Sequence, residues 1–79
     1  MMESNSNPVL HTRNIDTDFI RLDAFLKLCG AFVTGGQAKM AIQGGKVLVN
    51  GTECRMRGKK LVPGDLAEYG GNRYKVGRV

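Results

Sequence analysis

The spacing of apolar residues changes near the middle of the chain, at Gly44-Gly45. Before this pair, apolar residues recur at the three- and four-residue intervals of an amphipathic helix. After it, short alternating segments are separated by turns that contain glycine. A helix buries side chains at every third or fourth residue, whereas a strand buries every second one, so a pattern that fits one element does not fit the other. We therefore expect helices first and a sheet second, which is an α+β arrangement.

A first helix is predicted to begin at Leu22. Leu22, Phe25, Leu26 and Cys29 follow the i, i+3, i+4, i+7 spacing of one buried helix face. Gly30 comes directly after this stripe and is suited to ending the helix, because glycine adopts the left-handed conformation at little cost.

A second helix is predicted after a linker over residues 31–33. Thr34 and Gln37 form the Ser/Thr-x-x-Glu/Gln pattern of a capping box, whose side chains accept hydrogen bonds from the first free N–H groups of a helix. The helix is expected to run to about Gln43 and to end at Gly44-Gly45. Its inward-facing residues are then Ala38, Ala41 and Ile42.

The second half is predicted to form strands joined by tight turns. Asn50-Gly51 tolerates the positive φ angles of a type I′ turn, so residues 46–49 and 52–54 are expected to pair. Further strands are expected over residues 65–69 and 73–76, with an edge strand over residues 9–15. The predicted fold is two short helices packed on a small, twisted, mostly antiparallel sheet with a C-terminal hairpin.

A length of 79 residues allows one domain with a limited core. Residues 1–8 are rich in Ser and Asn and are predicted to form a flexible tail, which leaves residues 9–79 as the single domain. We expect a monomer.

Positive charge is concentrated in the middle of the chain. The net charge is +5, and residues 24–64 carry seven bases against one acid, Glu53, whereas residues 1–23 carry four acids against two bases. A cationic surface gains affinity for nucleic acid by releasing counterions from the phosphate backbone. No apolar run approaches the roughly 20 residues of a transmembrane helix, so we expect a cytoplasmic protein with a polyanionic partner and no membrane association.

Four of these bases fall within six residues, in a predicted loop that comprises Arg55, Arg57, Lys59 and Lys60. Lys39 and Lys46 add charge in neighbouring segments with almost no balancing acid. This density favours contact with a phosphate backbone over the alternative of a merely solubilising loop.

Gly35 and Gly36 open the predicted second helix, where glycine is otherwise a poor choice. Two explanations are about equally supported. The glycines leave backbone N–H groups open to a phosphate at the positive end of the helix dipole, or they only relieve crowding against the first helix.

No catalytic or metal-binding arrangement is recognisable. His11 is the single histidine and falls in the predicted edge strand, where we expect a solvated surface residue. Cys29 and Cys54 lack the spacing of a zinc or redox motif and are expected to be reduced thiols. Tyr69 and Tyr74 are candidates for stacking on bases, although packing within the hairpin is favoured. We expect no catalytic residue, metal or cofactor.

Four segments, in one order, resemble the S4 RNA-binding domain: Arg21–Leu26 (RLDAFL), Gln37–Lys39 (QAK), Gly45–Gly51 (GKVLVNG) and Val62–Asp65 (VPGD). The resemblance covers about residues 19–69. The short chain is more similar to the stand-alone bacterial S4-like proteins of the YbcJ and YaaA type than to S4 domains appended to pseudouridine synthases or tyrosyl-tRNA synthetases.

This resemblance implies the S4-like fold, with its αL motif, and binding to structured RNA, namely ribosomal RNA in ribosome assembly or translation. The implied contact face comprises Arg21, the start of the second helix with Gln37 and Lys39, and Lys46 with the loop after Asn50-Gly51. Many S4 domains carry Ser-Arg at the start of the second helix, where the Arg helps to hold RNA, and this chain has Thr34-Gly35 instead.

Combining charge and resemblance, the predicted RNA-binding residues are Arg21, Thr34, Gly35, Gly36, Gln37, Lys39, Lys46, Asn50, Arg55, Arg57, Lys59 and Lys60. Recognition is expected to depend on shape, because the narrow major groove of A-form RNA hides the bases. One alternative is a protein-binding adaptor that docks on an acidic partner at the ribosome through the same basic face. The second alternative is a small enzyme, although the sequence shows no nucleophile, base or metal cluster that supports it.

Overall fold

A computed structural model describes residues 9–79. The predicted flexible tail over residues 1–8 lies outside the described residues. Within this part of the chain, neither helix combines the length and the apolar content needed to cross a membrane.

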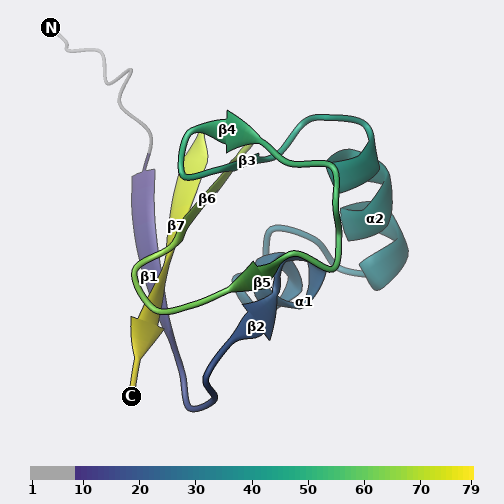
Figure 1. The fold of residues 1–79 in the computed structure, drawn as a ribbon. Helices are drawn as coiled ribbons and strands as arrows, with labels where there is room; N and C mark the ends of the chain where they lie inside the picture. The colour runs from purple at the N-terminus through teal and green to yellow at the C-terminus, as the bar shows by residue number, and fades with distance from the viewer. Residues whose placement is uncertain (1–8) are drawn as a thin grey trace, which may run out of the picture.

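The larger sheet has five strands in the order β1-β7-β6-β3-β4 (Figure 1). The strands are β1 (Val9–Ile15), β3 (Leu48–Val49), β4 (Thr52–Glu53), β6 (Leu66–Tyr69) and β7 (Asn72–Arg78). β1 lies at the predicted edge and pairs in parallel with β7, whereas the other three pairings are antiparallel. The sheet is therefore mixed.

Two-residue turns connect two of the antiparallel pairs, and the one at Asn50-Gly51 is as predicted. Asn50 (φ 51°) and Gly51 (φ 84°) join β3 to β4, and Gly70 (φ 62°) and Gly71 (φ 82°) join β6 to β7. Positive φ at both central residues is the type I′ geometry, which matches the right-handed twist of the paired strands. The predicted terminal hairpin is thus present, and its last strand is longer than predicted.

The two predicted helices are α1 (Leu22–Leu28) and α2 (Gly35–Gln43). Both end in the same way, on a glycine with positive φ: Gly30 at 82° and Gly45 at 78°. After α1 the N–H of Ala31 donates to the Leu26 carbonyl, and after α2 the N–H of Lys46 donates to the Ala41 carbonyl. These are the long bonds of a Schellman motif, which satisfies carbonyls that the helix leaves free.

The cap of α2 differs from the prediction in one bond. Thr34 Oγ1 accepts from the Gln37 N–H at 3.2 Å, as expected. Gln37 Oε1, however, accepts from the Val33 N–H at 3.1 Å, one residue before the N-cap. The Gln37 side chain therefore fixes the entry of the chain into α2 rather than satisfying an N–H of the helix itself.

A second, two-stranded sheet was not predicted. β2 (Ile20–Arg21) pairs antiparallel with β5 (Lys60–Leu61), so Lys60 lies in a strand and not in the predicted loop. A two-residue strand is too short to show an alternating period, and its partner is distant in sequence. This small sheet places the basic loop beside the start of α1.

The core lies between the helices and the inner face of the larger sheet. Its largest fully buried side chains are Leu22, Phe25, Leu26, Ile42, Val47, Leu61 and Val76. Phe32, which was assigned to a linker, is also buried, and its ring centroid lies 4.6 Å from that of Tyr69. Tyr74 is buried and stacks on the exposed His11 ring at 5.3 Å. Both tyrosines therefore have packing roles, although their ring partners lie outside the predicted hairpin, and the surface position of His11 is confirmed.

Candidate nucleic-acid interface

The loop between β4 and β5 is held against the start of α1 by backbone hydrogen bonds. The N–H of Leu22 donates to the Lys59 carbonyl at 2.8 Å, and the N–H of Asp23 donates to the Arg57 carbonyl at 3.1 Å. Arg21, the N-cap of α1, makes no capping bond with its side chain. The first N–H groups of a helix lack partners within the helix, so the loop carbonyls supply them and fix Arg57 beside α1.

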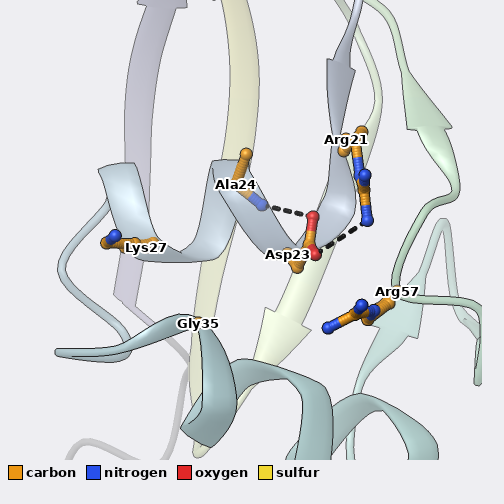
Figure 2. Close-up of a pocket in the computed structure, with 6 residues that line it drawn as sticks. All are labelled: Arg21, Asp23, Ala24, Lys27, Gly35 and Arg57. Carbon is orange, nitrogen blue, oxygen red and sulfur yellow. Dashed lines mark hydrogen bonds and ion pairs between the residues drawn. The ribbon is translucent and has the colours of Figure 1, made fainter.

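Docking of this loop creates a hollow of about 410 Å³ between α1, the start of α2 and the loop. Its lining residues come from all three segments: Arg21, Asp23, Ala24, Lys27, Gly35 and Arg57. In Figure 2 the Arg57 side chain extends from the loop toward α1, and Gly35 lies across the hollow from α1. We call this hollow the basic pocket.

Cations outnumber carboxylates in the basic pocket by three to one. The carboxylate belongs to Asp23, whose side chain is 16% exposed and lies 3.1 Å from Arg21 Nη2. Its other oxygen accepts from the Ala24 N–H at 2.8 Å (Figure 2). Among the described residues, neither Lys27 nor Arg57 forms an ion pair. The pocket therefore keeps positive charge that can meet an anion.

Gly35 contributes the backbone at the start of α2. A Cβ atom built on Gly35 would meet nothing within 4 Å, and one on Gly36 would meet only Thr34 Oγ1 at 3.9 Å. The explanation that these glycines relieve crowding against the first helix is therefore wrong. Their N–H groups precede the one that Thr34 caps, so they remain at the positive end of the helix dipole.

The structure brings three of the predicted residues, Arg21, Gly35 and Arg57, into the basic pocket. A second hollow, of about 310 Å³, includes Asn50, Arg55 and Lys59 among its lining residues. Gln37 and Lys46 line a third, of about 500 Å³, on α2 and the sheet. The remaining predicted residues, Thr34, Gly36, Lys39 and Lys60, are exposed outside these hollows.

Several of these residues are engaged within the domain. The Asn50 side chain donates to Asp65 at 3.1 Å and accepts from the Leu66 N–H at 3.0 Å, so it ties the β3–β4 turn to β6. Arg55 Nε lies 2.6 Å from Glu53 Oε2. Lys60 Nζ lies 4.7 Å from the centre of the Phe19 ring, in a cation–π contact.

Three lining residues of the basic pocket were not predicted: Asp23, Ala24 and Lys27. A signal for Lys27 was present, because residues four apart share one face of a helix, and Lys27 follows Asp23 by that interval. This face is offset from the buried stripe of Leu22, Phe25 and Leu26. Lys27, the cation absent from the predicted binding residues, thus lies on the exposed side of the amphipathic helix α1.

Comparison with known proteins finds a family match over most of the chain. The S4 domain family matches residues 13–77, which include every residue of the basic pocket. The chain is also similar to a protein from Bacillus subtilis (strain 168) described as "Probable ribosome maturation protein RlbA". The two are 41% identical over 66 residues, which cover 84% of this chain and 87% of the relative.

Proposed function

This chain belongs to the S4 domain family, and from that membership we propose that it binds structured ribosomal RNA during ribosome maturation, as a monomer and without catalysis. The name of the relative supports the ribosomal setting. The basic pocket supports the mode of binding.

The observation that carries this proposal is the grouping of Arg21, Lys27 and Arg57 around the exposed backbone of Gly35. Guanidinium groups donate paired hydrogen bonds to phosphate oxygens, and the N–H groups at a helix start add further donors. The pocket thus offers a phosphate both charge and directed hydrogen bonds. None of these contacts requires an exposed base edge, which suits a paired RNA segment recognised by shape.

The lining of the pocket also supports binding without a chemical step. Asp23 is its carboxylate, and both of its oxygens already accept hydrogen bonds, from Arg21 and from the Ala24 N–H. A general base must lie within hydrogen-bond reach of the proton that it removes, and both hydrogen bonds of Asp23 go to groups of the domain itself. Asp23 instead holds Arg21 in position.

The proposal can be tested with protein-free bacterial ribosomal RNA and two double variants of equal charge. Lys27→Ser with Arg57→Ser removes cations from the basic pocket. The control, Arg73→Ser with Lys75→Ser, removes cations from the opposite face of the sheet, because their neighbours Tyr74 and Val76 are buried on the inner face. Affinity is measured across a salt series.

We expect the pocket variant to bind ribosomal RNA more weakly and to lose about one unit of salt slope for each lost phosphate contact. The control should keep the salt slope of the unmodified protein. Equal losses in both variants would mean that only net charge matters. If the unmodified protein sediments with ribosomes but does not bind the protein-free RNA, an adaptor on an acidic ribosomal partner replaces the proposal.

A further inference from the structure

The third hollow, on the other side of α2 from the basic pocket, has a different chemical character. It measures about 500 Å³ and lies between the segment that enters α2, the helix itself and β6. Aromatic, thioether, amide and ammonium groups line it, from Phe32, Gln37, Met40, Lys46 and Tyr69, with no acidic residue among the lining. This volume falls within the range of about 300–1,000 Å³ typical of small-ligand sites. We call it the aromatic hollow.

The aromatic surface of this hollow is fixed in place. Tyr69 ends β6 and packs at 4.6 Å against the buried ring of Phe32, with a tilt of 44° between the two planes. Tyr69 itself remains partly exposed. A ring that is already immobilised loses little conformational entropy when a flat ligand packs against it.

Met40 also lines the hollow and is 77% exposed, although α2 buries its neighbours Ala41 and Ile42. Methionine is unbranched and polarizable, so it adapts to aromatic ligands of varied shape. The core does not account for an apolar side chain with this exposure. As a lining residue, its side chain is available to contact a flat ligand in the hollow.

The polar groups of the aromatic hollow favour an anionic ligand that is rich in hydrogen-bond acceptors. Gln37 uses its carbonyl oxygen to accept from the Val33 N–H, which leaves its NH₂ group as a donor. Lys46 is exposed, and no described carboxylate forms an ion pair with it. A nucleotide presents a flat base, carbonyl acceptors and a phosphate together.

We propose that the aromatic hollow binds an unpaired base of the RNA, stacked against Tyr69, while Lys46 meets the adjoining phosphate. This inference rests on the proposed function. Stacking on an aromatic side chain is possible for every base, because each has a flat π-face. The site is therefore expected to detect a single-stranded nucleotide rather than a particular sequence.

The position of the aromatic hollow relative to the basic pocket supports this assignment. Gly35 lines the basic pocket and Gln37 lines the aromatic hollow, both within the first turn of α2. At 3.6 residues per turn, these positions project about 200° apart around the helix. The two sites therefore lie on opposite sides of the start of α2, where a single RNA strand that passes over this end of the helix can contact both.

The experiment compares two RNA probes: a hairpin whose paired strands are joined by a flexible linker without bases, and the same hairpin with a short single-stranded 3′ extension. Tyr69→Leu removes the aromatic face, and Tyr69→Phe retains it. Because Tyr69 packs on Phe32, thermal unfolding must show that each variant is folded. Met40→Ser is a second variant, at an exposed position of the hollow. Its matched control is Met56→Ser, because Met56 is 66% exposed and does not line the hollow.

We expect the unmodified protein to bind the extended hairpin about 5- to 150-fold more tightly than the paired one, the range that stacking of one base gives. Tyr69→Leu should abolish this preference and Tyr69→Phe should keep it, with unchanged affinity for the paired hairpin. Met40→Ser should reduce the preference, and Met56→Ser should not.

Two outcomes would overturn the inference. One is equal affinity of the unmodified protein for both hairpins, which leaves the proposed function intact. The other is an unchanged preference in Tyr69→Leu with loss of sedimentation with ribosomes, which would assign the hollow to a protein segment. Failure to bind either hairpin would instead reject the proposed function itself.

Discussion

Arg55 and Arg57 are two residues apart in the same loop, yet the fold gives them different environments. Arg57 borders the basic pocket, and its carbonyl is held by the Asp23 N–H. Arg55 lies in another hollow, 2.6 Å from the Glu53 carboxylate. Backbone hydrogen bonds hold Arg57 beside the open basic pocket. Arg55, in contrast, forms an ion pair with the neighbouring Glu53. Density of charge in a sequence therefore overstates the charge that is available to a ligand.

The Arg55–Glu53 pair is supported by the end of α2. Gly45 has φ 78°, and a Cβ atom there would lie 2.8 Å from Glu53 Oε2 and 2.9 Å from Arg55 Nη2. The pair thus packs on bare backbone that glycine alone provides. Gly45 therefore ends α2 and also leaves the space that the Glu53–Arg55 ion pair fills.

The largest expected effect separates the two arginines. Arg57→Ser should weaken binding to protein-free ribosomal RNA by about 10- to 100-fold, because a charge-assisted hydrogen bond contributes about 1.5–3 kcal/mol. Arg55→Ser should change affinity by less than about fivefold, since Arg55 is already paired. Filter binding at one salt concentration measures both. Equal losses would contradict the contrast between the two ends of the loop.

Next in size is the effect of Gly45→Ala on stability. A non-glycine residue in the left-handed region costs about 1–2 kcal/mol, and the new methyl group also displaces the Glu53–Arg55 pair. Gly30→Ala is the matched control, because its φ is 82° and a Cβ there would meet nothing within 4 Å. Urea denaturation should show a greater loss for Gly45→Ala. A smaller loss than in the control would mean that the ion pair moves without cost.

A smaller effect tests the acid in the basic pocket. Asp23→Asn removes the negative charge but keeps an oxygen that can accept from the Ala24 N–H. The Arg21 guanidinium, no longer paired with a carboxylate, becomes available to a phosphate. Affinity for ribosomal RNA should therefore rise by about two- to fivefold at low salt, the scale of a partly exposed ion pair, and the gain should shrink as salt screens the charge. An unchanged affinity at every salt concentration would indicate that RNA does not enter this pocket.

The effect that is smallest at neutral pH concerns Cys29, at the C-terminal end of α1. Burial raises the pKa of its thiol from 9.0 to about 11, against the opposing influence of Arg13. The folded protein then holds this proton more tightly than the unfolded chain does, so stability falls as pH rises from about 9 to about 11. Denaturation curves should fall less steeply over that range in Cys29→Ser. Parallel curves for the two proteins would contradict this assignment.

The predictable parts of the fold are those that local sequence determines. The stripe from Leu22 to Cys29, the Thr34 cap and the Asn50-Gly51 turn each fix their own element within a few residues. The β2–β5 sheet, by contrast, depends on pairing between residues about 40 positions apart. A two-residue strand has no periodicity from which such pairing can be deduced.

The candidate site was predictable to a similar degree. Charge and resemblance identified Arg21, Gly35 and Arg57, which the fold brings together. They did not separate Arg57 from Arg55, because that distinction depends on the Asp23 N–H bond to the loop. Which side of the loop meets the pocket is a property of tertiary structure and not of composition.

The parallel pairing of β1 with β7 also constrains the order in which the domain can be completed. β1 has β7 as its sheet neighbour, and the Val79 N–H donates to the Ile15 carbonyl beyond the last pair. During synthesis β1 leaves the ribosome before β7 does. Its hydrogen bonds to β7 therefore cannot form until β7 has also left the ribosome. The helices α1 and α2 are close in sequence, so they can pack against each other before β7 is available. Pairing of β1 with β7 joins distant parts of the chain and therefore comes late.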